Sequence, residues 1–378
     1  MAGAIAQSVV GDFVFELAGP DDDPAIRRLL ANNSVPGRVS VTYEREPDYF
    51  LGCSTMGRSC QVLVARHQPS GQVVGVATRT IRPLFVNGQV EEVGYIGQLR
   101  VDRQFQGRWL VSSGFRFLHQ LHEDGRVKGY ITTIIEGNAQ AQGILIRRAR
   151  RHFPVYREVD RLCTLAIILR KPKPALPTTC EVGPATTAEL GAIVAFLRQQ
   201  GAQKQFFPVY RLEDFDDSPA TRGFRINDFV VARHDGQVVG VVGLWDQSSY
   251  KQTVVHAYHN WLYWLRPVYN VGLRIGGARP LPPPGRPIDY AYASFICVAN
   301  NDPGLFRVLL RQVYNLAAAR GYPYLMLGLS ERDPLLRVAR QYAHIPYHSR
   351  LYTVCWKDEV SFHEKLDRRL PYAEIATL

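Results

Sequence analysis

Two short strings occur twice in this chain, and their repetition restricts the fold more than any other feature of the sequence. The string VARH at residues 64–67 returns at 231–234, and GQVVGV at 71–76 returns at 236–241. In each place an apolar β-branched run, a polar turn and a second apolar run predict a β-hairpin. A hairpin repeated at such a spacing indicates an internal duplication, so we expect two similar α/β units in tandem.

A proline-rich segment at 170–177 (RKPKPALP) separates the two copies of the repeat. Its prolines lack the amide donors that a central strand needs, so it predicts a linker. We place the boundary near residue 175, which gives an N-terminal unit at 1–175 and a C-terminal unit at 176–378.

Both units are predicted to contain the same order of elements. The first has a helix near 24–32, strands at 61–67, 72–83 and 90–101, a helix at 107–124, a strand at 130–135, a helix at 139–151 and a strand at 164–169. The second has a helix at 187–199, the repeated hairpin, a strand at 290–298, a helix at 303–320 and a strand at 351–356. The predicted fold class is α/β, with two tandem units that are each a mixed twisted sheet flanked by helices.

The second unit is longer because it carries an insert at 258–287, rich in aromatic residues, arginine and proline. Large aromatic side chains usually pack in a core or an interface, so the insert could be a packing element between the units. It could equally form an apolar wall for a substrate, or a surface that contacts lipid or nucleic acid. We expect it to leave the common core and to lie against the first unit or over a cleft.

The composition is that of a globular protein, with 46% hydrophobic and 21% charged residues among 378. Lys and Arg outnumber Asp and Glu by 45 to 34, which predicts an anionic partner: a phosphorylated cofactor, an acidic carrier protein, RNA or a lipid surface. The six cysteines show no CxxC pair and no His-flanked spacing, so no metal is expected. The absence of a leader and of a membrane-spanning run predicts a cytoplasmic protein with no transmembrane segment.

Residues 99–111 (LRVDRQFQGRWLV) join the end of a predicted strand to a predicted helix. Unpaired amides at a helix start, reinforced by the helix dipole, can hold a diphosphate. With the order of elements around it, this segment resembles the acyl-CoA signature of the GNAT acyltransferase superfamily. The resemblance implies a co-substrate, acetyl-CoA or another acyl-CoA, bound by Leu99, Arg100, Val101, Gln106, Gly107, Arg108, Trp109, Leu110 and Val111.

Trp109 and Val111 stand where the superfamily has two glycines that let its backbone approach the diphosphate. Three interpretations follow. The loop binds CoA with the indole turned aside, it accepts an acyl group from a carrier protein, or it has lost the donor.

A second match is Asn138 and Ala141, which resemble the superfamily's Asn-x-x-Ala segment. In that pattern the Asn contacts the pantetheine arm, and a Tyr seven residues later protonates the leaving thiolate. The corresponding residue here is Leu145. Tyr156 is a candidate substitute, although a core tyrosine is the simpler interpretation.

Transfer to an amine needs a base and donors to the oxyanion. Glu92 is the first candidate base, and Glu136 at the end of the neighbouring strand is the second. The apolar tail at 370–378 is expected to dock rather than fray, and in some tandem relatives a terminal carboxylate acts as the base, which makes Leu378 a third candidate. Gly94 and Gly97 predict a bulge, whose amides in this superfamily bind the pantetheine and the reacting carbonyl.

The second copy replaces the phosphate loop with residues 300–304 (NNDPG), so it is predicted to be degenerate. The leading hypothesis is an N-acetyl- or N-acyltransferase that moves an acyl group from acyl-CoA to a small-molecule or peptide amine between the two units. One alternative is a transferase for a long acyl chain or an aminoacyl group, whose donor is an acidic carrier protein or an aminoacyl-tRNA. Nucleic acid is therefore not excluded as a partner. The other is a non-catalytic binding protein on the same scaffold.

Overall fold

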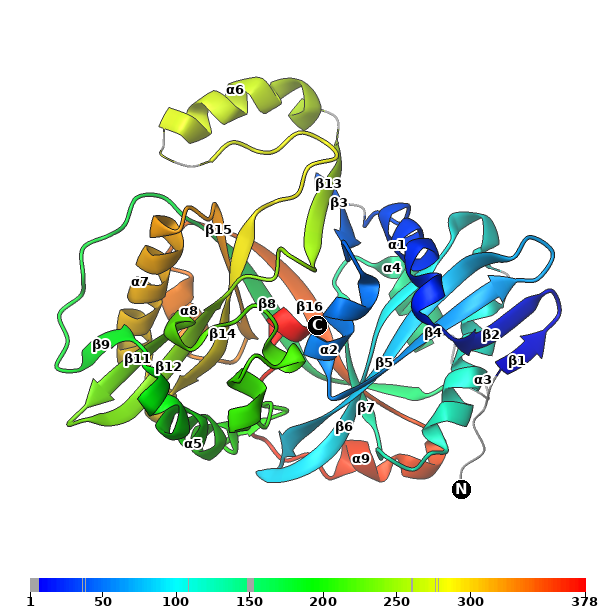
Figure 1. The fold of residues 1–378 in the computed structure, drawn as a ribbon, viewed down its shortest axis with the longest axis horizontal. Helices are drawn as coiled ribbons and strands as arrows, with labels where there is room; N and C mark the ends of the chain where they lie inside the picture. The colour runs from blue at the N-terminus through cyan, green and yellow to red at the C-terminus, as the bar shows by residue number, and fades with distance from the viewer. Residues whose placement is uncertain are drawn as a thin grey trace.

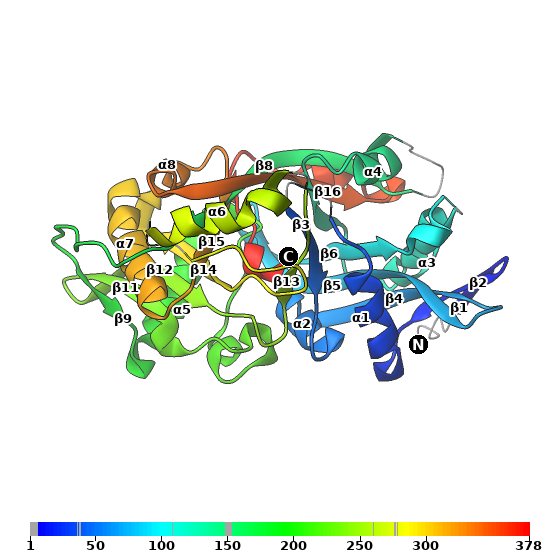
Figure 2. The same ribbon diagram turned by 90° about the horizontal axis from the view of Figure 1, so that it is seen from above.

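The computed structural model describes residues 7–35, 37, 39–107, 109–147, 153–259, 261–275, 277 and 279–378. A broad twisted sheet runs through the whole molecule, and helices lie on both of its faces (Figures 1 and 2). The strands up to the linker are β1 (Gln7–Val10), β2 (Phe13–Leu17), β3 (Val39–Glu44), β4 (Ser59–His67), β5 (Gln72–Val86), β6 (Gln89–Val101), β7 (Tyr130–Ile135) and β8 (Val155–Ile168). Those after it are β9 (Glu181–Pro184), β10 (Lys204–Gln205), β11 (Phe229–His234), β12 (Gln237–Trp245), β13 (Gln252–Tyr258), β14 (Tyr290–Val298), β15 (Tyr324–Ser330), β16 (His344–Cys355) and β17 (Leu370–Pro371).

The helices follow the predicted plan, with additions. They are α1 (Asp23–Ala31), α2 (Tyr49–Met56), α3 (Leu110–His122), α4 (Ala139–Gln142), α5 (Leu190–Gly201), α6 (Trp261–Ile275), α7 (Pro303–Ala319), α8 (Leu335–Ala339) and α9 (Ser361–Glu364). A π-helical turn, η3 (Gly143–Arg147), continues α4, and 148–152 of the predicted helix lie outside the described residues. Strands β1 to β3 and helix α2 were not predicted.

Among the described residues the main sheet contains 13 strands in the order β1-β2-β4-β5-β6-β7-β16-β8-β15-β14-β12-β11-β9. We call the part from β1 to β16 in this order the first half of the sheet, and the part from β8 to β9 the second half. In the first half the alternation along β4 separates two layers. Val62 and Val64 pack with α1 and α2 on one face, whereas Leu63 and Ala65 pack with α3 on the other.

The repeated hairpins have the same register and the same bulge. Ala65 pairs with Gly75 and the register then shifts by one residue, and Ala232 pairs with Gly240 before an identical shift. The arginine that follows in each copy binds an acidic residue at the start of the first helix of its unit: Arg66 binds Asp22, and Arg233 binds Glu189. The two hairpins that carry the repeated strings therefore have matching backbone pairing, and the internal duplication stays a prediction.

The last strand of each copy crosses into the other half of the sheet. Strand β16, near the end of the chain, lies between β7 and β8, and β8 of the first copy pairs with β15 of the second. The long antiparallel β8–β16 pair therefore joins the halves through the centre of the molecule (Figure 1). The predicted linker at 170–177 has no helix or strand, while the division into units at residue 175 stays a prediction.

A second ribbon connects the halves outside the main sheet, where β3 pairs antiparallel with β13. The predicted insert begins at the end of β13 and carries α6, which stands clear of the sheet (Figure 1). The insert thus leaves the common core as predicted. The contact with the first half is made by β13, directly before it.

Candidate active site

The parallel strands β6 and β7 separate after two paired residues. Gly94 pairs with Tyr130 and Tyr95 with Ile131, and among the described residues no further pairing joins these strands. Strands β14 and β15 separate in the same way after Tyr292. Because the backbone groups along such a separation lack a strand partner, each half has one place where a ligand can bind the chain's own amides and carbonyls.

Each separated strand carries a bulge at the same position. In β6 the register with β5 shifts next to Gln98, which has a φ of +55°. In β14 the register with β12 shifts next to Phe295, which has a φ of +56°. The bulge predicted in the strand of Gly94 and Gly97 is therefore confirmed, and β14 has a matching bulge.

The two glycines themselves make room for aromatic rings rather than for a ligand. A Cβ at Gly94 would lie 2.0 Å from the Tyr130 ring, and a Cβ at Gly97 would lie 2.5 Å from the Tyr95 ring. Any larger residue at either position would displace a buried tyrosine.

In the second half the bulge is filled by the chain itself. The Phe295 amide donates a hydrogen bond of 2.7 Å to Glu374 Oε2, and the Ile296 amide donates one of 3.2 Å to the Tyr372 hydroxyl. Tyr372 in turn donates to Glu374 over 2.8 Å. Burial raises the pKa of the Glu374 carboxyl. In the first half, no side chain among the described residues accepts from the equivalent amides of Gln98 and Leu99.

The helix that follows each bulge shows the same contrast. Helix α7 begins with the Asp302 carboxylate, whose Oδ1 accepts from Gly304 (2.6 Å) and Leu305 (3.2 Å), so a carboxylate already occupies the place of an anionic ligand. Helix α3 begins at Trp109 with no side-chain cap. Its first amides are left unpaired by the described residues, and the helix dipole makes this end attractive to an anion.

The loop before α3 holds several of the predicted cofactor-binding residues. Gln106 Nε2 donates to the Val101 carbonyl over 3.3 Å, and Gly107 has a φ of +81° with no atom near the position of a Cβ. Arg108 lies outside the described residues. Leu110 is buried in the first turn of α3 and Val111 packs against the core below, so these two support the loop rather than line it.

Trp109 takes the left-handed conformation that a glycine adopts readily, with a φ of +46°. Its ring lies edge-on to Phe13 at 6.1 Å and 3.1 Å from the position of a Cβ at Gly11, so it rests on the β1–β2 hairpin. The indole thus has the position that the first of the three interpretations requires, while CoA binding by this loop stays a prediction.

The second matched segment lies beside this loop. Asn138 caps α4 by accepting from the Ala141 amide over 3.0 Å, and Gln140 Nε2 donates to Gln106 Oε1 over 3.1 Å. Leu145, at the position of the superfamily's tyrosine, packs against the core. Tyr156 is edge-on to Tyr352 at 6.2 Å, and burial raises the pKa of its phenol. This packing favours a structural role for Tyr156.

Glu92 is exposed on β6, opposite Pro83. It precedes the bulge residue Gln98 by six positions, which is about 20 Å along an extended strand. That separation argues against Glu92 as the base for a reaction at the bulge.

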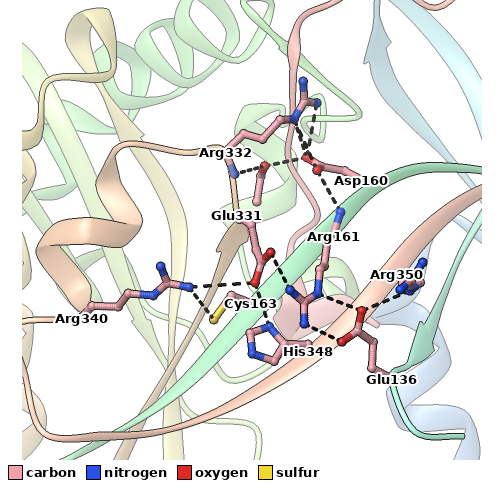
Figure 3. Close-up of polar contacts among 10 residues, drawn as sticks. Glu136, Asp160, Arg161, Cys163, Glu331, Arg332, Arg340, His348 and Arg350 are labelled. Carbon is pink, nitrogen blue, oxygen red and sulfur yellow. Dashed lines mark hydrogen bonds and ion pairs between the residues drawn. The ribbon is translucent and has the colours of Figure 1, made fainter.

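Glu136 lies in a network of ion pairs at the junction of β7, β8 and β16 (Figure 3). Arg161 binds both of its carboxylate oxygens at 2.8 and 2.7 Å, and Arg350 Nε donates to Oε1 over 3.1 Å. The hydrogen bond from Arg161 is the main cause that lowers the pKa of Glu136. A carboxylate held by two guanidinium groups is a poor base, so we assign Glu136 a structural role.

The same network contains three potential metal ligands, Cys163, Glu331 and His348, whose ligand atoms lie within 4.8 Å of one another. Arg161 Nη1 binds Glu331 at 3.0 Å, and Arg340 Nη2 lies 3.8 Å from the Cys163 sulfur (Figure 3). These guanidinium groups supply the positive charge that a metal ion would bring, so we propose no metal site there.

The C-terminal tail docks between the halves, as its apolar sequence predicts. Strand β17 pairs with β10, and Tyr372, Ala373, Ile375 and Ala376 are all buried. Ile375 fills the space above Gly328, where a Cβ would lie 2.3 Å away. Leu378 packs against the cluster that contains Tyr95 and Ile131, the last paired residues of β6 and β7. Leu378 also packs against the cluster that contains Val241 and Leu325, so the end of the tail lies between the packed cores of the two halves.

A lysine that the sequence analysis did not select holds this end of the chain. Lys251 Nζ donates to the backbone oxygens of Ala376 (3.1 Å) and Leu378 (3.2 Å). Burial, reinforced by the nearby charge of Arg45, holds the pKa of Lys251 well below its usual range. Arg82 fixes the same turn by donating to the Thr377 hydroxyl over 2.8 Å. The tail is thus bound by polar contacts as well as by apolar packing.

The sequence analysis also missed Glu374 and Tyr372, which bind the bulge amides of the second half. One feature of the sequence points to Glu374. Glu374 is the only acidic residue between Leu370 and Leu378. A single charge in an otherwise apolar docking segment needs a buried partner. The sequence does not show that this partner is the amide of Phe295, in a strand about 80 residues earlier.

No protein-family model matches the sequence, and no curated protein is significantly similar to it. Solved structures do match the fold. N-myristoyltransferase from Saccharomyces cerevisiae with bound myristoyl-CoA gives a TM-score of 0.63 at 11% identity, covering 93% of this chain and 85% of that one. A GCN5-related N-acetyltransferase from Sphaerobacter thermophilus gives 0.54 at 13% identity, covering 98% and 100%. A GCN5-related glucosamine N-acetyltransferase region of a fungal multi-domain β-N-acetylglucosaminidase gives 0.61 at 16% identity, covering 91% and 38%.

The chain therefore has the GNAT fold, which confirms the fold class that the sequence predicts. Its match to N-myristoyltransferase extends over both halves of the sheet, since it covers 93% of the residues. At identities between 11% and 16% these likenesses establish the fold alone.

Proposed function

We propose that the protein is an acyltransferase that moves an acyl group from acyl-CoA to an amine, and that the first half alone binds the donor. The observation that carries this proposal is the contrast between the halves. In the second half Glu374 and Tyr372 occupy the bulge amides and Asp302 occupies the helix start. In the first half the described residues leave the equivalent groups without a side-chain partner.

In this proposal the diphosphate of CoA binds the amides at the start of α3 and the turn at Gly107. Arg108 is assigned to the diphosphate from the sequence alone. The pantetheine arm lies between β6 and β7, near Asn138, and the thioester carbonyl accepts from the bulge amides at Gln98 and Leu99. These amides are already oriented by the strand, so they stabilise the oxyanion with little reorganisation.

The amine acceptor approaches from the side of the tail. Its nitrogen attacks the thioester carbon, the carbon–sulfur bond breaks, and the thiolate leaves and takes up a proton. The amine must lose a proton before or during attack. In a protein that ends at Leu378, the oxygen bound by Lys251 belongs to a terminal carboxylate that could accept this proton, which is the role we propose for it.

A non-catalytic binding protein is the second candidate, favoured by Leu145 in the place of the superfamily's proton-donating tyrosine. Such a protein would bind CoA as described and transfer nothing. Binding and turnover therefore have to be measured on the same samples.

The test uses two substitutions at Ser112, which lies in the first turn of α3 and donates to the Trp109 carbonyl over 2.7 Å. Ser112→Glu places a negative charge where the diphosphate is proposed to bind. This charge should not destabilise the fold, because acidic residues in the first turn of a helix interact favourably with the helix dipole. We expect calorimetry to show CoA binding to the wild type and to Ser112→Gln, and much weaker binding to Ser112→Glu with an unchanged melting temperature.

Release of free thiol from acetyl-CoA and longer acyl-CoA thioesters, with peptide and small-molecule amines, then measures turnover. If CoA binds but no combination of acyl-CoA thioester and amine releases thiol, the non-catalytic candidate is favoured. Equal CoA affinity in Ser112→Glu and Ser112→Gln, or no binding by the wild type, would refute the proposed donor site. Absence of CoA binding by the wild type would favour a carrier-protein or tRNA donor.

A further inference from the structure

Helix α6 carries its apolar stripe on the outside of the molecule. Trp264, Val268, Val271 and Ile275 follow the spacing of one helix face, and they expose 79%, 70%, 54% and 84% of their surfaces. A helix that packs on a globular core turns this face inward. Here the helix stands away from both halves of the sheet (Figure 1).

Two polar side chains of α6, Asn270 and Arg266, face the protein instead. Asn270 exchanges two hydrogen bonds with the backbone of Leu281, at 2.8 and 3.3 Å, and the Arg266 guanidinium lies over the Tyr258 ring at 5.7 Å. The Tyr258 hydroxyl donates to the Pro282 carbonyl, which fixes the proline-rich loop beneath the helix. The outward direction of the apolar stripe is therefore set by specific contacts on the opposite face.

The charge around this stripe has one sign. From Gln252 to Ile288 the sequence holds four Arg residues and no Lys, Asp or Glu. Arg279 and Arg286, on the loop after α6, are exposed. A surface of this kind attracts an anionic partner, and a row of exposed apolar side chains next to it needs a partner that is also apolar.

We propose that α6 is an interfacial helix that binds the surface of a lipid bilayer containing anionic lipids. Its Trp and aliphatic side chains would enter the boundary between headgroups and acyl chains, and the arginines of the following loop would contact lipid phosphates. A bilayer supplies both chemistries along one flat surface, which suits a row of apolar side chains exposed on one face of a helix. None of the described helices is long and apolar enough to cross a membrane, so the helix would lie in the surface.

Flotation of the full chain with vesicles tests this proposal. We expect binding to vesicles of phosphatidylcholine with phosphatidylglycerol, weaker binding to phosphatidylcholine alone, and loss of binding at high salt. Val268→Glu should weaken binding at least about tenfold, since a charge in the stripe opposes insertion. Because Val268 is exposed, its substitution should leave the melting temperature unchanged.

Two further variants serve as controls. Val90→Glu changes a valine that is 51% exposed on β6, far from α6 in the fold, and should bind vesicles like the wild type. Arg279→Glu should weaken binding only to the vesicles that contain phosphatidylglycerol.

Three results would overturn the proposal. The first is absence of wild-type binding to the anionic vesicles, and the second is equal binding by Val268→Glu and Val90→Glu. The third is a dimer, detected by sedimentation, that Val268→Glu dissociates while no vesicle is bound, because the stripe would then be an interface between two copies of this chain.

Discussion

Glu374 Oε2 accepts a hydrogen bond of 2.7 Å from the amide of Phe295, a residue whose backbone position repeats that of Gln98 in the first half. In the second half, the chain's own carboxylate thus occupies the amide at the strand bulge. In the first half, the proposed function assigns the equivalent amide to the carbonyl of a thioester. This contrast is the reason for proposing a single donor site, in the first half.

Replacing Glu374 by Ala should lower the free energy of unfolding by about 1–3 kcal/mol, because the buried Phe295 amide and Tyr372 hydroxyl lose their acceptor. Urea denaturation followed by fluorescence measures the change. Glu364→Ala is a matched control, since the side chain of Glu364 is 64% exposed and its ion pair contributes at most about 1 kcal/mol. Equal stability of the two variants would contradict the structural role of Glu374.

Glu189 gives a prediction for the dependence of stability on pH. The hydrogen bond from Arg233 is the main cause that lowers its pKa from 4.5 to about 2. A carboxyl with a lowered pKa stabilises the folded state above its unfolded pKa, and this contribution is lost as the pH falls through the folded value. The wild type should therefore exceed Glu189→Gln in free energy of unfolding by a constant amount at neutral pH. The difference should shrink from pH 4.5 towards pH 2, and a difference that does not change over this range would refute the assignment.

Trp109→Gly tests whether the indole is turned away from the donor. Glycine adopts the positive φ of this position without strain. The exposed Trp109 ring packs on the β1–β2 hairpin, away from the proposed donor. CoA affinity, measured by calorimetry, should therefore be retained or increased. A large loss of affinity would show that the indole belongs to the binding site.

Lys251→Met should separate catalysis from donor binding. The lysine holds the backbone oxygen of Leu378 and is not part of the proposed donor site. We expect kcat to fall while the affinity for CoA stays the same. Adding residues after Leu378 should have the same effect with a nearly unchanged melting temperature, and full activity of both proteins would refute a catalytic role for the tail.

Local patterns account for the parts of this fold that the sequence predicts. The strands at 130–135 and 290–298 have the predicted bounds, and the repeated hairpins share a register, because alternation and turn residues act within a few positions. The exchange of β8 and β16 was not predicted, since an apolar strand carries no signal for which of two similar sheets it joins.

The candidate site was predicted in part for the same reason. The loop at Gln106 and the docking of the tail follow from short segments, whereas Lys251 and Glu374 act on residues more than 75 positions away. Glu136 was selected for its place at a strand end, and its two arginine partners come from β8 and β16, which only the exchange of strands brings together.

A crystal structure with a non-hydrolysable acyl-CoA analogue tests the central claim most directly, because it shows which half holds the donor. We predict one molecule per chain, with its diphosphate at the start of α3 and its carbonyl oxygen within hydrogen-bonding distance of the Gln98 or Leu99 amide. A donor bound at the start of α7 with Glu374 displaced from the Phe295 amide would contradict the account, as would one donor in each half.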